Sequence, residues 1–314
     1  MKKFARIIGT GSYLPSKVVT NFDLEKTLDT SDEWITARTG IKERRIVTDQ
    51  NTCDLALKAC LKALSMAEIK PGDIDLIILS TTTPDKIFPA TATMLQNRLG
   101  ATCPAFDLQA VCAGFVFALT TAQQYIENGS AKNILVVGSE TMSKIVDWSD
   151  RSTAILFADG AGAVVLSADN STGIKHSKLF SDGSYLSSLH VNNNGIDELG
   201  VIQMEGNEVF KIAVNRLSDL AEETLKDCNM SPEELTWMVP HQANIRIINA
   251  VAKRIKLPMD KVIQTLDKHG NTSAASIPLA LDEGVRDGRI KKGDTLLFEG
   301  IGGGFSWGSI LLEY

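Results

Sequence analysis

The sequence predicts an α/β protein with a parallel or mixed β-sheet, built from two halves that repeat the same order of elements. Two observations carry this prediction. In the first half, short apolar segments of strand length alternate with longer helical stretches. In the second half the same order of segments recurs at about half the length of the chain, a period too long for a solenoid.

The first half contains two predicted strands, each preceded by a predicted helix. The apolar runs at residues 74–80 and 134–138 have the length and composition of buried strands. Helical stretches at residues 52–66 and 116–128 precede them. Because helices separate the strands, we expect one parallel or mixed sheet.

The second half is predicted to repeat these elements. Each matched pair shares a helix-to-strand turn, a buried strand or a turn of small residues. The matched segments are residues 70–79 and 232–241, 98–104 and 254–258, 131–137 and 292–298, and 160–167 and 303–312. We therefore divide the chain into residues 1–170, which carry Cys112, and residues 171–314, which carry His241 and Asn271. Cys112 and Asn271 then occupy equivalent turns, and we expect a pocket where the halves meet.

Composition excludes several classes of protein. The 314 residues are 44% hydrophobic, which suits one large domain or two of medium size. No apolar run is long enough to span a bilayer, and charge and glycine interrupt residues 1–11 before a signal-peptide core forms. We therefore expect a cytoplasmic protein without a membrane partner. A net charge of −6 disfavours nucleic acid, and an acidic partner would need a local basic patch.

The five cysteines are scattered and odd in number, without CxxC pairs or a histidine in metal-ligand spacing, so we expect neither disulfides nor a metal site. Cys112 differs from the other four cysteines in its setting, because it lies where a predicted apolar strand is followed by a predicted apolar helix. A helix start favours the thiolate. The alternative is a buried cysteine that packs as a small hydrophobic residue.

Downstream residues favour the reactive interpretation of Cys112. His241 provides an imidazole N–H, Asn271 an amide donor, and the glycine run at 302–304 an unhindered backbone, a set that suits acyl transfer. His241 alone would more often be a core histidine, and Asn271 alone a turn residue. Two further glycine segments, at 9–11 and 159–162, complete neither a GxGxxG nor a GxxxxGK[ST] pattern, and tight turns explain them.

Seven segments in order along nearly the whole chain resemble blocks of the β-ketoacyl-[acyl-carrier-protein] synthase III family. They are residues 8–15, 31–35, 38–44, 111–115, 240–246, 269–276 and 302–308. The ordered set is far more specific than any one block. The resemblance implies a thiolase-like, internally duplicated, five-layered αβαβα fold, which agrees with the repeat.

The resemblance also implies an activity, the first condensation of bacterial type II fatty-acid synthesis. Cys112 would take the acyl group of a short acyl-CoA, with the backbone N–H groups of Cys112 and Gly303 as the oxyanion hole. Malonyl-acyl-carrier protein would then lose CO₂ and attack the acyl-cysteine. The neutral donors His241 Nε2–H and Asn271 Nδ2–H suit the enolate of that step. CoA is a substrate in this scheme, so no cofactor is expected, and the family implies a homodimer.

Binding residues follow from side-chain chemistry together with the resemblance. Trp34 and Arg151 form a pair able to sandwich adenine, Arg38 suits a phosphate, and Asn244 suits the pantetheine arm of CoA. For the acidic carrier protein we expect a basic patch, in which residues seven apart share one helix face. Its predicted members are Lys211, Arg246, Lys253 and Arg254.

The acyl pocket is predicted to involve Phe88, Met142 and Leu156. Phe88 matches a position that, in the family's dimer, reaches into the neighbouring subunit's pocket, and its bulk favours a small primer such as acetyl. Gln109, Val111 and Ala158 depart from the family pattern, so the primer length stays open. Two other functions also remain open: a related enzyme of specialised ketide formation or acyl transfer, and a non-catalytic scaffold that binds acyl-CoA.

Overall fold

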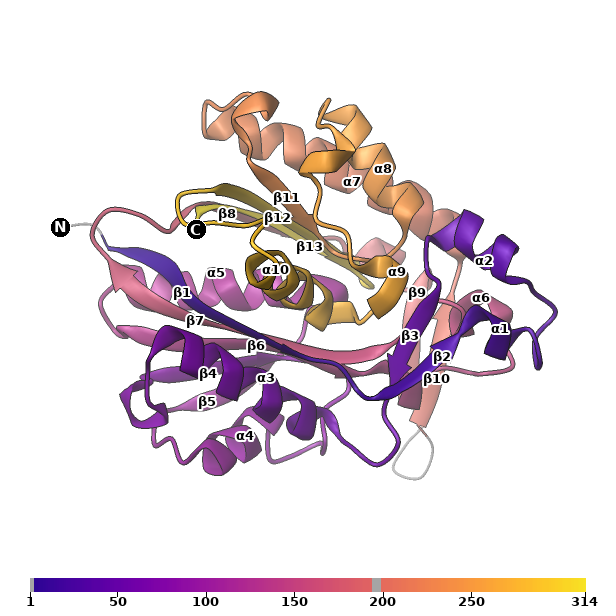
Figure 1. The fold of residues 1–314 in the computed structure, drawn as a ribbon, viewed down its shortest axis with the longest axis horizontal. Coiled ribbons are helices and arrows are strands. Elements are labelled where there is room, and N and C mark those ends of the chain that lie inside the picture. Colours follow the sequence, from indigo (N-terminus) through magenta and orange to yellow (C-terminus); the bar gives the residue numbers. More distant parts are fainter. Residues whose placement is uncertain (1–2, 194–198) are drawn as a thin grey trace.

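Two β-sheets lie one above the other in the computed structural model, which describes residues 3–193 and 199–314 (Figure 1). The first sheet has the order β1-β7-β6-β4-β5, and the second has the order β11-β12-β13-β8. The first comprises β1 (Phe4–Tyr13), β4 (Leu76–Ser80), β5 (Ala105–Leu108), β6 (Asn133–Thr141) and β7 (Asp159–Asp169). The second comprises β8 (Ile174–Ser181), β11 (Trp237–Pro240), β12 (Thr295–Gly302) and β13 (Ser306–Glu313).

Helices form three layers, one on the outer face of each sheet and one between the two sheets (Figure 1). The outer face of the first sheet carries α3 (Thr52–Ala67) and α4 (Thr91–Leu99). Between the sheets lie α5 (Gly114–Glu127) and α10 (Ser276–Arg286), and α7 (Gly206–Asp227) and α8 (Ile245–Arg254) cover the outer face of the second sheet. The predicted αβαβα fold is confirmed. No helix in the described part of the chain is both long and apolar enough to cross a membrane.

Both halves follow the same pairing pattern. β6 pairs parallel with β4 and antiparallel with β7, as β12 pairs parallel with β11 and antiparallel with β13. The 3-10 turns η1 (Pro71–Asp73) and η5 (Pro232–Glu234) precede the equivalent strands β4 and β11. The repeat is incomplete in one place. The first half continues after residue 104 into β5, but in the second half the segment after residue 258 forms only an isolated bridge between Val262 and Met238. The chain turns there into η6 (Met259–Lys261) and α9 (Leu266–His269).

The predicted equivalence of Cys112 and Asn271 needs a shift of three residues. Cys112 lies in η2 (Val111–Ala113) before α5, and the corresponding turn before α10 is η7 (Ser273–Ala275). Both turns begin on a residue with positive φ, Val111 at 49° and Ser273 at 50°. Cys112 is therefore equivalent to Ala274, and Asn271 lies three residues earlier in the same turn.

The chain passes from the first sheet to the second between Asp169 and Ile174. We propose residues 1–170 and 171–314 as the two halves on this basis. The predicted element bounds differ slightly, since α5 begins at Gly114 rather than 116, and β6 continues to Thr141. Continuation of β6 carries the chain to Met142, beside the site described below.

Short elements gather at one end of the sheets, at the right of Figure 1. Most of them contribute residues to a separate apolar cluster that includes Ile35, Met142 and Ile202. The elements of this end are β2 (Lys17–Thr20), α1 (Asn21–Leu24), α2 (Asp32–Thr39), β3 (Glu43–Ile46), η3 (Met142–Lys144), α6 (Arg151–Ala154), η4 (Gly183–Tyr185), β9 (Leu189–Asn193) and β10 (Leu199–Met204).

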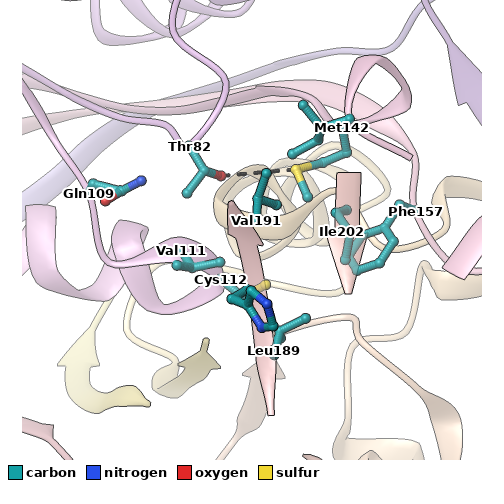
Figure 2. A pocket seen from close by; sticks show the side chains of 11 residues that line it. Thr82, Gln109, Val111, Cys112, Met142, Phe157, Leu189, Val191 and Ile202 are labelled. Carbon is teal, nitrogen blue, oxygen red and sulfur yellow. Dashed lines mark hydrogen bonds between the residues drawn. The ribbon is translucent and has the colours of Figure 1, made fainter. Parts of the chain in front are cut away.

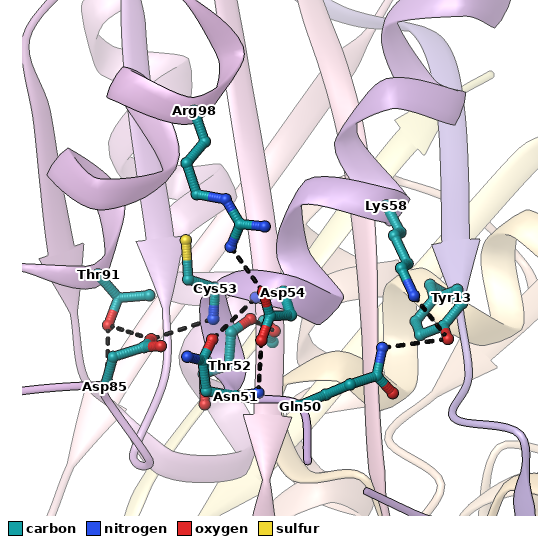
Figure 3. Close-up of polar contacts among 11 residues, drawn as sticks. Tyr13, Gln50, Asn51, Thr52, Cys53, Asp54, Lys58, Asp85, Thr91 and Arg98 are labelled. Carbon is teal, nitrogen blue, oxygen red and sulfur yellow. Dashed lines mark hydrogen bonds and ion pairs between the residues drawn. The ribbon is translucent and has the colours of Figure 1, made fainter. Parts of the chain in front are cut away.

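Polar contacts anchor the start of α3 on the outer face (Figure 3). Asn51 and Asp54 form a reciprocal capping box, which satisfies backbone N–H groups at the helix start. Arg98 of α4 donates to Asp54 at 2.8 Å, and Lys58 donates to the Tyr13 hydroxyl at 3.0 Å. These contacts hold the outer helices on the first sheet, away from Cys112.

Candidate active site

Cys112 lies at the junction of β5 and α5, in the predicted strand-to-helix turn, and is buried. The glycine turn after β12 packs directly against it. A Cβ placed on Gly302 would lie 2.6 Å from the backbone N of Cys112, so a side chain at position 302 would displace the backbone of Cys112. This close approach explains the glycine at position 302.

Burial raises the pKa of the Cys112 thiol to about 12. Desolvation of the charged form thus opposes the stabilisation of the thiolate that we expected from the helix start. With this pKa the thiol carries its proton at neutral pH.

His241 directly follows β11, and its backbone N–H donates to the Glu299 carbonyl of β12 at 2.8 Å. The imidazole is buried, which lowers the pKa of His241 to about 3 and keeps the ring neutral at physiological pH. The neighbouring Gln242 is fully buried and fixes this turn by donating to the Pro240 carbonyl at 2.7 Å and accepting from the Thr265 N–H at 3.0 Å.

Asn271 is held by its backbone and by its side-chain oxygen. Its N–H donates to the Leu156 carbonyl at 2.9 Å, and its carbonyl accepts from the Ala158 N–H at 2.9 Å. The side-chain Oδ1 accepts from the Ser273 N–H at 2.9 Å. Because only the amide oxygen can accept that bond, the Nδ2 group remains as the donor that Asn271 can offer to a ligand.

Cys112, His241 and Asn271 line one cavity, together with Trp34, Arg38 and Asn244. The structure therefore brings together residues predicted from segments more than 200 positions apart. Asn244 caps α8, and its Oδ1 accepts from the Arg246 N–H at 2.8 Å, which leaves its amide nitrogen as a donor.

Arg151 lies over the ring of Trp34, the residue with which it was predicted to form a pair. Its Cζ lies 4.7 Å from the Trp34 ring centroid, and the Cζ of Arg38 lies 4.3 Å from the same centroid. Arg151 also donates to the Asp29 carbonyl at 2.6 Å. The predicted slot for adenine between Trp34 and Arg151 is therefore closed, because cation–π contacts fill it in the absence of a ligand.

A second, apolar cavity also reaches Cys112 (Figure 2). Met142, one of the three residues predicted for an acyl pocket, lines this cavity. Leu156 lines the larger cavity instead, and Phe88, with 83% of its surface exposed, lines neither. Sequence reasoning missed most of the wall, because its residues come from separate segments without a common pattern. They are Thr82, Ile145, Phe157, Leu189, His190, Val191 and Ile202.

Comparison with known proteins agrees with this geometry. Residues 106–183 match the family model described as 3-oxoacyl-[acyl-carrier-protein (ACP)] synthase III, and residues 225–314 match the model of its C-terminal region. The chain is 71% identical over its full length to β-ketoacyl-[acyl-carrier-protein] synthase III of Vesicomyosocius okutanii, which is covered in full as well. It belongs to the β-ketoacyl-[acyl-carrier-protein] synthase III family.

Solved structures are similar throughout the chain. The synthase III from Aquifex aeolicus has a TM-score of 0.96 and 48% identity, with 99% of this chain and 100% of that chain covered. The priming β-ketosynthase of the R1128 polyketide pathway has a TM-score of 0.95 and 36% identity, with 99% and 97% covered. As a member of the synthase III family, this chain is an acyltransferase-type condensing enzyme that initiates fatty-acid synthesis.

In this synthase III, a buried carboxyl that the sequence did not single out supports the pocket wall. Glu140 of β6 accepts from the hydroxyls of Thr81, Thr82 and Thr83 at 3.1, 2.8 and 2.7 Å. It also accepts from the Thr82 and Thr83 N–H groups at 3.1 and 3.2 Å. One side chain thus holds the loop that carries Thr82 into the wall of the apolar cavity beside Cys112.

Glu140→Gln is expected to lower the free energy of unfolding by about 1–3 kcal/mol, because an amide NH₂ replaces an acceptor inside a buried network. We also expect weaker discrimination between primers, since Thr82 loses its support. Urea unfolding and acyl loading with a primer series measure the two effects. Glu313→Gln, at a half-buried carboxylate paired with exposed Lys175, is the matched control. A variant as stable and as selective as the parent contradicts this role.

One member of the predicted basic patch forms ion pairs within the chain. Lys211, Arg246 and Lys253 are exposed, and Arg246 also lines the cavity that contains Cys112. Arg254 instead forms an ion pair with Glu222 at 2.8 Å and approaches Asp219 at 3.4 Å. These ion pairs neutralise the charge of Arg254 within the chain. The remaining residues of the patch lie nearer the mouth of the cavity.

Among the described residues, no group of three or more histidines, cysteines and carboxylates could hold a metal ion.

Proposed function

We propose that Cys112 carries the acyl group in a decarboxylative Claisen condensation between a short acyl-CoA and malonyl-acyl-carrier protein. The products are 3-oxoacyl-acyl-carrier protein, CoA and CO₂. One observation carries the proposal: Cys112, His241 and Asn271 line a single cavity that also contains Trp34 and Arg38. That cavity offers a nucleophile, two neutral donors, and groups suited to adenine and phosphate.

In the first half-reaction, the Cys112 sulfur attacks the thioester carbonyl of the acyl-CoA. Backbone N–H groups of Cys112 and Gly303 would hold the oxyanion. The turn that contains Gly303 is placed beside Cys112 by the preceding residue, Gly302, which packs against the backbone of Cys112. The bond from carbon to the CoA sulfur breaks, and the thiol proton of Cys112 ends on the departing CoA. Arg151 must leave Trp34 for adenine to stack there, because it now fills that slot.

In the second half-reaction, the malonyl group loses CO₂ and its electron pair passes into a thioester enolate. Neutral His241 and the amide of Asn271 would donate to the enolate oxygen. The carbanion carbon then attacks the acyl carbonyl on Cys112, the carbon–sulfur bond breaks, and the thiol is restored by a proton. The half-reactions thus use different parts of the site.

The primer binds in the apolar cavity beside Cys112, and we propose a small acyl group such as acetyl. Met142 and Phe157 form part of its apolar wall. The chain would act as a homodimer, because β5 is an edge strand and the neighbouring Ile87 and Phe88 are 90% and 83% exposed.

A reducing cytoplasm suits the five unpaired thiols of the chain. We propose neither a nucleic-acid nor a membrane partner.

The acceptor test examines the proposed function directly. Purified protein is mixed with acetyl-CoA and either malonyl-acyl-carrier protein or malonyl-CoA, followed by a panel of straight and branched primers. We expect product with the carrier-protein substrate and with short primers. Condensation with malonyl-CoA alone would instead indicate specialised ketide formation, and failure of Cys112 to gain an acyl group would indicate a non-catalytic scaffold.

Arg246→Glu is expected to raise KM for malonyl-acyl-carrier protein by roughly 3- to 10-fold at low salt, because reversal of a rim charge weakens attraction to an acidic partner. Acyl loading from acetyl-CoA should change little. Steady-state kinetics at two salt concentrations measure the effect. Lys292→Glu, an equal charge change at an exposed position before β12, is the control. An unchanged KM contradicts the patch assignment.

A further inference from the structure

A buried hydroxyl contacts the side of His241 that faces away from the proposed reaction. The Nδ1 atom of His241 lies 2.6 Å from Oγ of Ser276, the first residue of α10. The backbone N–H of Gln242 donates to the same Oγ at 3.2 Å. Both side chains are buried, with 5% of His241 and 2% of Ser276 exposed. The contact is therefore shielded from water.

The hydrogen bonds around Ser276 Oγ decide whether this hydroxyl or His241 Nδ1 donates in the contact. Ser276 Oγ already accepts from Gln242, and its own proton has no other acceptor among the described residues. If Nδ1 carried a proton, Oγ would accept twice and its hydroxyl proton would stay unpaired in a buried site. Such an unsatisfied donor costs about 1–3 kcal/mol. The hydroxyl therefore donates to Nδ1.

We propose that Ser276 is a positioning residue that holds His241 in the tautomer with its proton on Nε2, so that the imidazole offers an N–H to the enolate. The inference rests on the proposed function, because it supplies the donor which that function requires. Without Ser276, the neutral ring is free to place its proton on either nitrogen.

The repeated fold explains why His241 and Ser276 lie close together. Ser80 ends β4 in the first half, and Gly114 begins α5; a Cβ on Gly114 would lie 1.9 Å from Ser80 Oγ. His241 and Ser276 occupy the equivalent places after β11 and at the start of α10. The backbone therefore places the first residue of each central helix directly against the end of a strand. In the second half the two residues that meet there, His241 and Ser276, can form a hydrogen bond.

Nuclear magnetic resonance of the imidazole nitrogens tests the tautomer without relying on activity. The chain has four histidines, so ¹⁵N labelling gives a simple spectrum, and loss of one signal set in His241→Asn assigns His241. We expect the Nε2–H pattern in the parent protein, and a mixture or the Nδ1–H pattern in Ser276→Ala. An Nδ1–H pattern in the parent, or an unchanged pattern in Ser276→Ala, overturns the inference.

Kinetics provide the second measurement. Ser276→Ala should lower kcat for decarboxylation of malonyl-acyl-carrier protein by roughly 10- to 100-fold with little change in KM, because the loss concerns donor orientation. Ser276→Thr, which retains the hydroxyl, should restore both tautomer and rate. Ser309→Ala, which removes another buried hydroxyl bonded to Thr224 at 2.6 Å, controls for packing.

The outcomes separate this inference from the proposed function. A changed tautomer with an unchanged decarboxylation rate overturns the role of Ser276. Unchanged decarboxylation in His241→Ala would instead overturn the proposed role of His241 itself. If Ser276→Ala does not fold, the parent spectrum and Ser276→Thr still decide the tautomer.

Discussion

Cys112→Ala is expected to abolish acyl loading and to lower condensation by at least about 1,000-fold, because no other group in the cavity can hold the acyl chain as a thioester. Intact mass spectrometry after mixing with acetyl-CoA should show one acetyl group on the parent protein and none on the variant. Cys228→Ala, which removes a partly buried thiol outside both cavities, should still load.

The same variant separates the two half-reactions. Because His241 and Asn271 remain in place, Cys112→Ala should still release CO₂ from malonyl-acyl-carrier protein. Radiolabelled malonyl groups measure this release in the absence of a primer. An acetyl adduct on the alanine variant would show that another residue is the nucleophile.

Asn271→Ala is expected to slow decarboxylative condensation by roughly 100- to 1,000-fold, the usual cost of losing one donor to a developing oxyanion. Acyl loading should remain within about threefold of the parent, since the proposed loading step uses backbone donors instead. Single-turnover loading and steady-state condensation measure the two steps separately. Asn97→Ala, at an exposed position on α4, is the matched control.

Asn271→Asp tests the chemistry with little change of shape. The aspartate can still accept from the Ser273 N–H, but its second oxygen replaces the amide donor. We expect condensation to fall at least as far as in Asn271→Ala, because an acceptor would face the enolate. Equal loss of loading and condensation in both variants contradicts the proposed division of labour.

The fold, and the positions of Cys112, His241 and Asn271 within it, were predictable because both depend on local patterns. Apolar runs of strand length and amphipathic helical stretches set the element order, and the same order appears twice. Cys112, His241 and Asn271 follow predicted strands or lie in turns before helices, so a prediction of those elements also places these residues at element ends. The family resemblance then supplied the roles that a single sequence cannot assign.

Contacts between distant segments were not predictable from the sequence. Arg254 was predicted as a member of the basic patch, and the structure adds that α7 presents Glu222 to it. Arg151 was predicted to sandwich adenine with Trp34, and the structure adds that it stacks on Trp34 directly. Glu140 and Ser276 were not singled out, since neither stands in a pattern that reveals its partner.

Sequence alone determined that Cys112 would stand at a strand-to-helix turn, and that a duplicated α/β framework would bring His241 and Asn271 to it. Only the tertiary structure decided the state of these groups. Burial raises the pKa of the Cys112 thiol, lowers that of His241, and presses Ser276 against the imidazole. Desolvation and hydrogen-bond geometry depend on which segments meet in space, and no local pattern encodes that meeting.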